Sequence, residues 1–119
     1  TAARPILLTA APVDELSPRV ASVFDIRTID DHGALARRIG ELVDEGVDTV
    51  LCEGGPRLLG MLVDLDLVDE WLLTTGPSIR GGDSRRMVHG AAETERPLLL
   101  DRIWHDDTGA IFARYLTDR

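Results

Sequence analysis

The chain has 119 residues, of which 44% are hydrophobic and 29% are charged, and its formal net charge is −8. This length and apolar content predict a single compact domain, residues 1–119. The negative charge disfavours nonspecific binding to nucleic acid or anionic membranes and favours a small-molecule ligand. Because no segment has the apolar length of a membrane-spanning helix and Cys52 has no partner for an internal disulfide, a cytoplasmic location is the default expectation.

The first part of the chain predicts two short strands. The apolar run RPILLTAA, opened by Pro5, predicts a buried strand near residues 5–9. A polar connection is expected at residues 12–20. The alternating sequence VFDIRTI then predicts a second strand at residues 23–29.

An amphipathic helix is predicted next, at residues 30–46. Asp30 or Asp31 is the expected N-cap, and Gly46 is the expected C-terminal stop. The apolar residues at helical spacing are Leu35, Ala36, Ile39, Leu42 and Val43.

The middle of the chain predicts another strand and another helix. VDTVLC, residues 47–52, is expected to be a buried strand. PRLLGMLVDLDL, residues 56–67, is expected to be a helix. Its predicted buried residues are Leu58, Leu59, Leu62 and Val63.

The last part of the chain predicts strands separated by turns. DEWLLTTGPSI, residues 69–79, predicts a strand, and the glycine-rich residues 80–86 predict a loop. Residues 98–107 and 110–118 predict two strands joined near Thr108 and Gly109. The alternation of strands and helices predicts an α/β fold with a mixed, mostly parallel sheet, helices packed on it and a C-terminal antiparallel hairpin.

The stretch TVLCEGGPRLLGML raises the functional question. In open α/β sheets, ligands bind where strands lead into helix N-termini, and Glu53 to Pro56 occupy such a place in the predicted fold. Glycines allow a ligand to approach the backbone, and the first amides of a helix favour an anion. The amides of Gly55, Arg57 and Leu58 are therefore candidate anion contacts, although a simple chain reversal explains the two glycines equally well.

Two common nucleotide motifs are excluded in this stretch. Met61 and Leu62 follow Gly60 where an ATP-binding P-loop needs Lys and Ser or Thr, and the glycine spacing is not that of a dinucleotide fingerprint. A glycine inside a helix, as at Gly60, needs a reason, which is either close packing or a nearby ligand. Glu53 is either a solvated acid or a contact to a second ligand, since strand alternation turns its side chain away from the following amides.

The block LCEGGPRLLGMLVDLDLVDEWLLTTGPSIRGG closely resembles the reductase domain of riboflavin biosynthesis. This domain belongs to the pyrimidine reductase family, whose fold is similar to that of dihydrofolate reductase. The most specific part of the resemblance runs from EGGP to LVDE, and the whole match runs from about Pro5 to the C-terminal hairpin.

The resemblance implies an NADPH-dependent reductase acting on 5-amino-6-(5-phosphoribosylamino)uracil or a related pyrimidine or pterin. It implies that Glu53 contacts the substrate. It also implies a cofactor-binding segment made of Gly54, Gly55, Pro56, Arg57, Leu58, Leu59, Gly60 and Met61. No catalytic side chain and no metal are assigned, because hydride transfer from a nicotinamide needs neither a protein nucleophile nor a metal.

The family's reductase domain is about twice as long, so the chain is expected to be the C-terminal half of such a domain. A homodimer is expected from the same resemblance. A noncatalytic nucleotide-binding or dimerisation module of the same fold is the alternative. A further alternative is that the same turn binds S-adenosylmethionine, but this explains less of the sequence block. A metal site is not expected, because the three histidines are far apart and have no thiol or carboxylate partner at ligand spacing; they are His32, His89 and His105.

Overall fold

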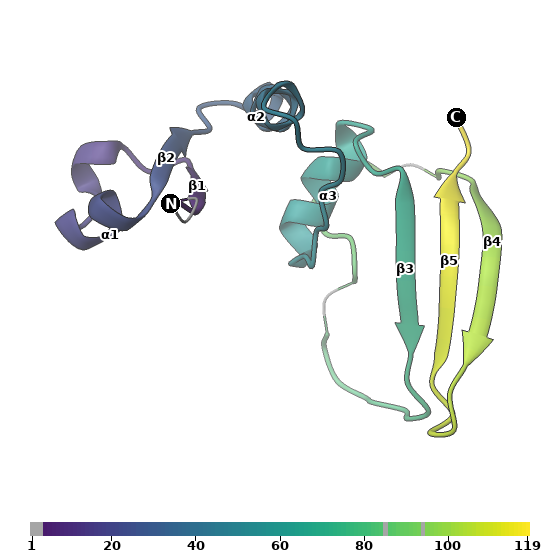
Figure 1. The fold of residues 1–119 in the computed structure, drawn as a ribbon. Coiled ribbons are helices and arrows are strands. Elements are labelled where there is room, and N and C mark those ends of the chain that lie inside the picture. Colours follow the sequence, from purple (N-terminus) through teal and green to yellow (C-terminus); the bar gives the residue numbers. More distant parts are fainter. Residues whose placement is uncertain (1–3, 85, 94) are drawn as a thin grey trace. The chain divides into compact units, whose positions relative to one another are not determined.

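The computed structural model of the protein describes residues 4–84, 86–93 and 95–119. The chain divides into two compact units, unit 1 (Thr1–Leu51) and unit 2 (Cys52–Arg119). Figure 1 shows the helices and strands of both units.

Unit 1 contains a pair of parallel strands, β1 (Ile6–Thr9) and β2 (Asp25–Thr28). Their register aligns Ile6 with Asp25 and Thr9 with Thr28. Both strands lie within the ranges predicted from the sequence. Parallel strands require a crossover connection between them, and here residues 10–24 provide it.

The polar connection predicted at residues 12–20 lies in this crossover, and its helices were not predicted. It contains a short 3-10 helix, η1 (Val13–Glu15), and a helix, α1 (Pro18–Val23). The hydroxyl of Ser17 accepts a hydrogen bond from the amide of Val20 at the start of α1. Pro18 occupies the first turn, where its missing N–H breaks no helical hydrogen bond. Ser-Pro is therefore a helix-start signal in this sequence.

The helix α2 (His32–Asp44) is confirmed, with Asp31 as its N-cap. The Asp31 carboxylate accepts a hydrogen bond from the amide of Ala34 at 2.8 Å. After the helix, Gly46 has a φ of +96°, the left-handed conformation that commonly ends helices. Ala34 and Leu35 are buried. Val43 was predicted on the apolar face, but it lies at the end of the helix and its surface is 58% exposed.

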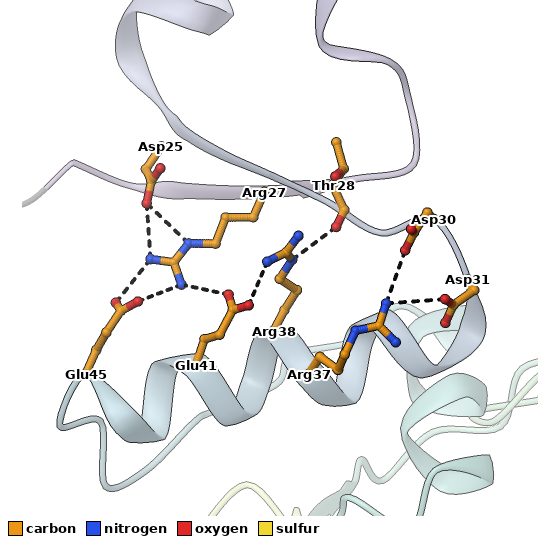
Figure 2. Close-up of polar contacts among 9 residues, drawn as sticks. All are labelled: Asp25, Arg27, Thr28, Asp30, Asp31, Arg37, Arg38, Glu41 and Glu45. Carbon is orange, nitrogen blue, oxygen red and sulfur yellow. Dashed lines mark hydrogen bonds and ion pairs between the residues drawn. The ribbon is translucent and has the colours of Figure 1, made fainter.

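Ion pairs connect α2 to β2, as Figure 2 shows. The guanidinium of Arg27 on β2 forms ion pairs with Asp25 on its own strand and with Glu41 and Glu45 on α2. The nearest of these contacts, from Nη1 to Glu45 Oε1, is 2.8 Å long. The hydrogen bonds that Arg27 donates to Glu45 and Asp25 raise its pKa further above its usual range. The carboxylates of Glu41 and Glu45 therefore connect α2 to β2 through Arg27.

The predicted buried strand at residues 47–52 is wrong. These residues form no strand, and Val50 and Leu51 are exposed, Leu51 by 73%. A strand needs a neighbour with which to form its backbone hydrogen bonds, and parallel strands are stable when both of their faces are covered. No strand of the described residues pairs with this apolar run.

Unit 2 contains one helix and an antiparallel sheet. The helix is α3 (Pro56–Asp64), and the strands are β3 (Glu70–Thr75), β4 (Leu98–His105) and β5 (Ile111–Thr117). The strand order is β3-β5-β4, so the last strand lies between the other two. The predicted C-terminal hairpin is confirmed.

The turn of this hairpin is held by an aspartate. Asp106 Oδ1 accepts hydrogen bonds from the amide and hydroxyl of Thr108 and from the amide of Ala110. The hydrogen bond from the Thr108 hydroxyl, followed by those from the backbone amides, lowers the pKa of Asp106.

The predicted loop at residues 80–86 has no helix or strand among its described members, and Arg85 lies outside the described residues.

The fold is therefore mixed α/β, with one parallel strand pair, one three-stranded antiparallel sheet and helices. The expectation that the sheet is mostly parallel is wrong for the described residues, which form one parallel and two antiparallel strand pairs. The missing strand at residues 47–52 accounts for part of this difference. Of the helices in the described residues, none is both long and apolar enough to cross a membrane.

The buried side of α3 is narrower than predicted. Gly60 and Leu62 are buried, whereas Leu59 and Val63 are partly buried. Leu58 was predicted to be buried, but it lies in the first turn and is 37% exposed. The exposed Leu58 leaves the start of the helix less covered than its middle.

Arg114 on β5 connects the three strands on one face of the sheet. Its guanidinium lies 2.7 Å from Glu70 Oε2 on β3 and 3.0 Å from Asp101 Oδ2 on β4. The hydrogen bond from Arg114 lowers the pKa of Glu70 below its ordinary value of 4.5, and the attraction between the two charges adds to the effect. The ion pair therefore requires ionised Glu70.

Glu70→Gln is expected to remove a pH-dependent part of the stability of unit 2. Because the folded-state pKa of Glu70 is lowered, its contribution is fully present above the ordinary value of 4.5 and is lost as the pH falls through the folded-state value. The free energies of unfolding of the native protein and the variant should therefore differ at neutral pH and converge in acid. Urea unfolding at a series of pH values measures this, and a difference that stays constant into acid would contradict it.

Candidate functional site

The start of α3 carries the predicted anion site. Gly55 is the N-cap residue and Pro56 is the first helical residue, as the sequence predicts. No side chain caps this helix. By helix geometry, the amides of Arg57 and Leu58 have no acceptor within the helix. These two N–H groups lie at the positive end of the helix dipole, which favours an anion.

Open space adjoins the helix start. A Cβ atom built on Gly55 would meet no heavy atom within 4 Å. At Gly54, φ is +93°, a conformation that residues with side chains rarely adopt, and the peptide bond between Gly54 and Gly55 is cis. Amide donors without a cap, next to open space, fit a phosphate or pyrophosphate group.

Glu53 precedes this turn and is exposed. Within the described residues, no side chain forms an ion pair or hydrogen bond with its carboxylate. The sequence argument placed Glu53 at the end of a strand, but residues 47–52 form none, so strand alternation does not determine where its side chain points. The role of Glu53 as a substrate contact remains a prediction of the family resemblance.

Solvent exposure varies along the predicted cofactor-binding segment. Arg57 and Leu58 are exposed, whereas Leu59 and Met61 are partly buried and Gly60 is fully buried. The predicted residues therefore divide into an outward-facing first turn and a second turn that packs inside unit 2. The cationic side chain of Arg57 lies in the first group, which suits an anionic ligand.

Gly60 packs against the backbone of a distant segment. A Cβ atom built on Gly60 would collide with the carbonyl oxygen of His89 and would lie 3.2 Å from the amide nitrogen of Ala91. Close packing, one of the two reasons considered for a glycine in this helix, is therefore sufficient to explain it.

Sequence reasoning missed this segment, residues 88–92, which lies along α3. The amide of His89 donates a hydrogen bond to the carbonyl oxygen of Pro56 at 3.0 Å. The amide of Ala92 donates to Asp64 Oδ1 at 2.9 Å. The two contacts connect the segment to both ends of the helix, so it supports the helix start that forms the candidate site. Gly60 was the only sequence signal for it.

The described residues contain no group of three or more His, Cys, Asp or Glu side chains placed to hold a metal ion. Cys52 is a free, partly buried thiol. The chemistry that this site offers is therefore anion binding by backbone amides, next to a carboxylate.

Three of the solved structures with a similar fold come from bacteria. A pyrimidine reductase-like protein from Corynebacterium diphtheriae matches with a TM-score of 0.77 and 19% identity, covering 97% of this chain and 50% of its own. A protein described as a riboflavin biosynthesis protein, from a Shewanella species, matches with a TM-score of 0.73 and 17% identity, covering 97% and 61%. RibD from Acinetobacter baumannii matches with a TM-score of 0.68 and 19% identity, covering 87% and 29%.

The chain thus spans between 29% and 61% of the length of these relatives. At such low identities the likeness shows the fold alone. Among curated proteins, none is similar enough in sequence to count as a match. The sequence does match the family described as the RibD C-terminal domain, over residues 1–112. Since this match covers nearly the whole chain, the protein belongs to the RibD C-terminal domain family.

Proposed function

We propose that the chain is part of an NADPH-dependent reductase in riboflavin biosynthesis, with a dihydrofolate-reductase-like fold. Its proposed substrate is 5-amino-6-(5-phosphoribosylamino)uracil or a related pyrimidine or pterin. The observation that carries the proposal is the family match over residues 1–112, together with an uncapped helix start beside open space within the matched region. A reduced nicotinamide cofactor has a pyrophosphate that this helix start suits.

In this proposal the first turn of α3 holds the cofactor. The amides of Gly55, Arg57 and Leu58 donate hydrogen bonds to the pyrophosphate, and the cationic side chain of Arg57 adds attraction. Gly55 allows the close approach because nothing fills the space beside its Cα atom. NADPH, when bound, supplies the hydride, and the protein's part is to position it.

Glu53 holds the substrate in this proposal. Its carboxylate immediately precedes the cofactor turn in the chain, so the substrate and the cofactor are bound by adjacent residues. A carboxylate accepts hydrogen bonds from the ring N–H groups and sugar hydroxyls of such a substrate. Proximity of the two ligands is what a direct hydride transfer needs.

A homodimer is the assembly that we propose for the protein. The face of the antiparallel sheet that carries Leu72 also carries Leu99 and Trp104, and these three side chains are 59%, 53% and 46% exposed. Exposed apolar side chains that gather on one face favour a protein contact. Sedimentation analysis of the protein measures the assembly, and a monomer at high concentration would contradict it.

Turnover tests the proposed reaction. The protein is incubated with NADPH and 5-amino-6-(5-phosphoribosylamino)uracil, and the loss of reduced nicotinamide absorbance is followed. Steady oxidation that depends on the substrate is expected. Glu53→Gln should raise the KM for the substrate about tenfold while leaving the affinity for NADPH within about twofold, because only the substrate loses a charged acceptor.

Two other results would contradict parts of this proposal. A folded dimer that binds NADPH but oxidises none with any aminopyrimidine would indicate the noncatalytic module. Equal kinetics for Glu53→Gln and the native protein would show that Glu53 does not contact the substrate.

A further inference from the structure

A pocket of about 230 Å³, open to solvent on one side, lies in unit 2 between the C-terminal end of α3 and one face of the antiparallel sheet. It lies toward the end of α3 that is remote from the uncapped helix start. Most of its lining is apolar, and it includes Val63, Val68, Trp71, Leu73, Val88 and Leu98. None of the residues assigned to the proposed reaction lines it.

Hydrogen bonds fix the walls of this pocket. Residues 88–92 are held along α3 by the amides of His89 and Ala92, as described above. At the other side, the hydroxyl of Thr117 on β5 donates to the carbonyl oxygen of Val68 at 2.5 Å. Residues 88–92 are thus held to the helix, and the loop at Val68 is held to the sheet, which favours a preformed small-molecule site.

The size and lining suit one aromatic ring. An apolar cavity of about 150 Å³ is large enough to stay dry and bind benzene, so this larger pocket has room for a ring with one substituent. The indole ring of Trp71 forms part of the wall and offers a flat surface against which a second ring packs favourably. A polar ligand body would leave its hydrogen-bonding groups unsatisfied against these aliphatic walls.

The polar part of the lining includes Arg96, Asp66 and Thr117. Arg96 Nη1 lies 3.4 Å from Asp66 Oδ1, a long contact. The Asp66 carboxylate is shared with Arg119, whose Nε lies 3.5 Å from Oδ2. A guanidinium has five N–H donors in a planar fork, so Arg96 has donors left for a second acceptor. A carboxylate matches this fork better than a single carbonyl oxygen does.

We propose that this pocket binds a small aromatic carboxylate, with its ring beside Val63 and Trp71 and its carboxylate on Arg96. The site is separate from the helix start that binds the cofactor in the proposed function. The proposed ligand is a small molecule other than the nicotinamide cofactor.

The test is an NMR titration of the whole chain with benzoate, and with toluene as the analogue that lacks the carboxylate. Both tryptophans give an indole N–H signal, and only Trp71 lines the pocket. Trp104 pairs with Phe112 and Trp71 with Tyr115, so the two indoles lie on opposite faces of the sheet. Benzoate should shift the Trp71 signal saturably and leave the Trp104 signal in place.

Two variants distinguish this site from nonspecific binding. Arg96→Met should weaken benzoate binding about tenfold, through the loss of a charged hydrogen bond, and change toluene binding by less than about twofold. Met87→Trp should abolish the Trp71 shift with both compounds, because it places a larger side chain in the lining. Met87 is half exposed and lies outside the helices and strands, so this variant is expected to fold, as circular dichroism would verify.

Three results would overturn the proposal. The first is no saturable shift of the Trp71 signal with benzoate at about 10 mM, a concentration that would reveal even weak binding. The second is an equal shift of the Trp104 signal. The third is benzoate affinity that is unchanged in both Arg96→Met and Met87→Trp.

Discussion

Gly60→Ala is expected to destabilise unit 2 by about 1 to 3 kcal/mol, the usual range for forcing extra atoms into a packed interior. The added methyl group would collide with the carbonyl oxygen of His89, which is backbone and cannot rotate away as a side chain can. To relieve the collision, residues 88–92 would have to move off α3. The hydrogen bond from the His89 amide to the Pro56 carbonyl would then lengthen or break.

Gly40→Ala is the matched control for this prediction. Gly40 also lies inside a helix, α2, but a Cβ atom built there would meet no heavy atom within 4 Å. Alanine should therefore stabilise the protein at this position by up to about 1 kcal/mol, since it has the higher helix propensity. Urea unfolding followed by tryptophan fluorescence reports on unit 2, which holds both tryptophans. Circular dichroism reports on all the helices, of which α2 is the longest among the described residues. Stabilisation by both alanines would show that residues 88–92 do not pack on Gly60.

Gly55→Asp is expected to weaken NADPH binding without lowering the stability of the protein. Aspartate is a preferred N-cap residue, and the extended backbone of Gly55, with φ of −78°, accepts a side chain. The variant should thus be as stable as the native protein, or slightly more stable. NADPH binding should fall about 30-fold or more, roughly 2 kcal/mol, because the carboxylate caps the amides and repels the pyrophosphate.

Gly55→Asn is the control, since asparagine has nearly the same shape and capping ability without the charge. We expect its NADPH binding to lie between those of the native protein and Gly55→Asp. Isothermal titration calorimetry with NADPH measures all three affinities. If the aspartate variant bound NADPH as tightly as the native protein, the pyrophosphate would not lie on this helix start.

The parts of the fold that depend on residues close together in the sequence could be predicted. Asp31 and Gly46 delimit α2, and Gly55 and Pro56 open α3, because caps act within a few residues of the helix end. The hairpin turn near Thr108 was likewise predictable. The helix α1 was missed although Ser17 and Pro18 carry the local signal for it.

The features of the fold that were not predicted depend on contacts between residues that are far apart in the sequence. Whether residues 47–52 form a strand depends on a hydrogen-bonding neighbour and not on their apolar composition. Leu58 fits the apolar pattern of α3 but is 37% exposed, because burial depends on tertiary packing that the pattern does not report. The packing of His89 on Gly60 joins residues 29 positions apart, which no local pattern reveals.

The start of α3, where the candidate site is proposed, was predictable for the same reason as the other helix ends. Gly-Gly-Pro ahead of an apolar helix predicted an uncapped N-terminus, and the structure has one. The placement of Glu53 was argued from a strand that is absent, so that part of the site depends on the family resemblance.

In the proposed function, the first amides of α3 hold the pyrophosphate of NADPH. The most direct measurement is an NMR titration of the isotope-labelled protein with NADPH, following the backbone amide signals. We expect the Arg57 and Leu58 signals to shift saturably, and more than those at the start of α2, where Asp31 already caps the helix. Saturable shifts confined to other residues, or none at Arg57 and Leu58 at a saturating concentration of NADPH, would contradict it.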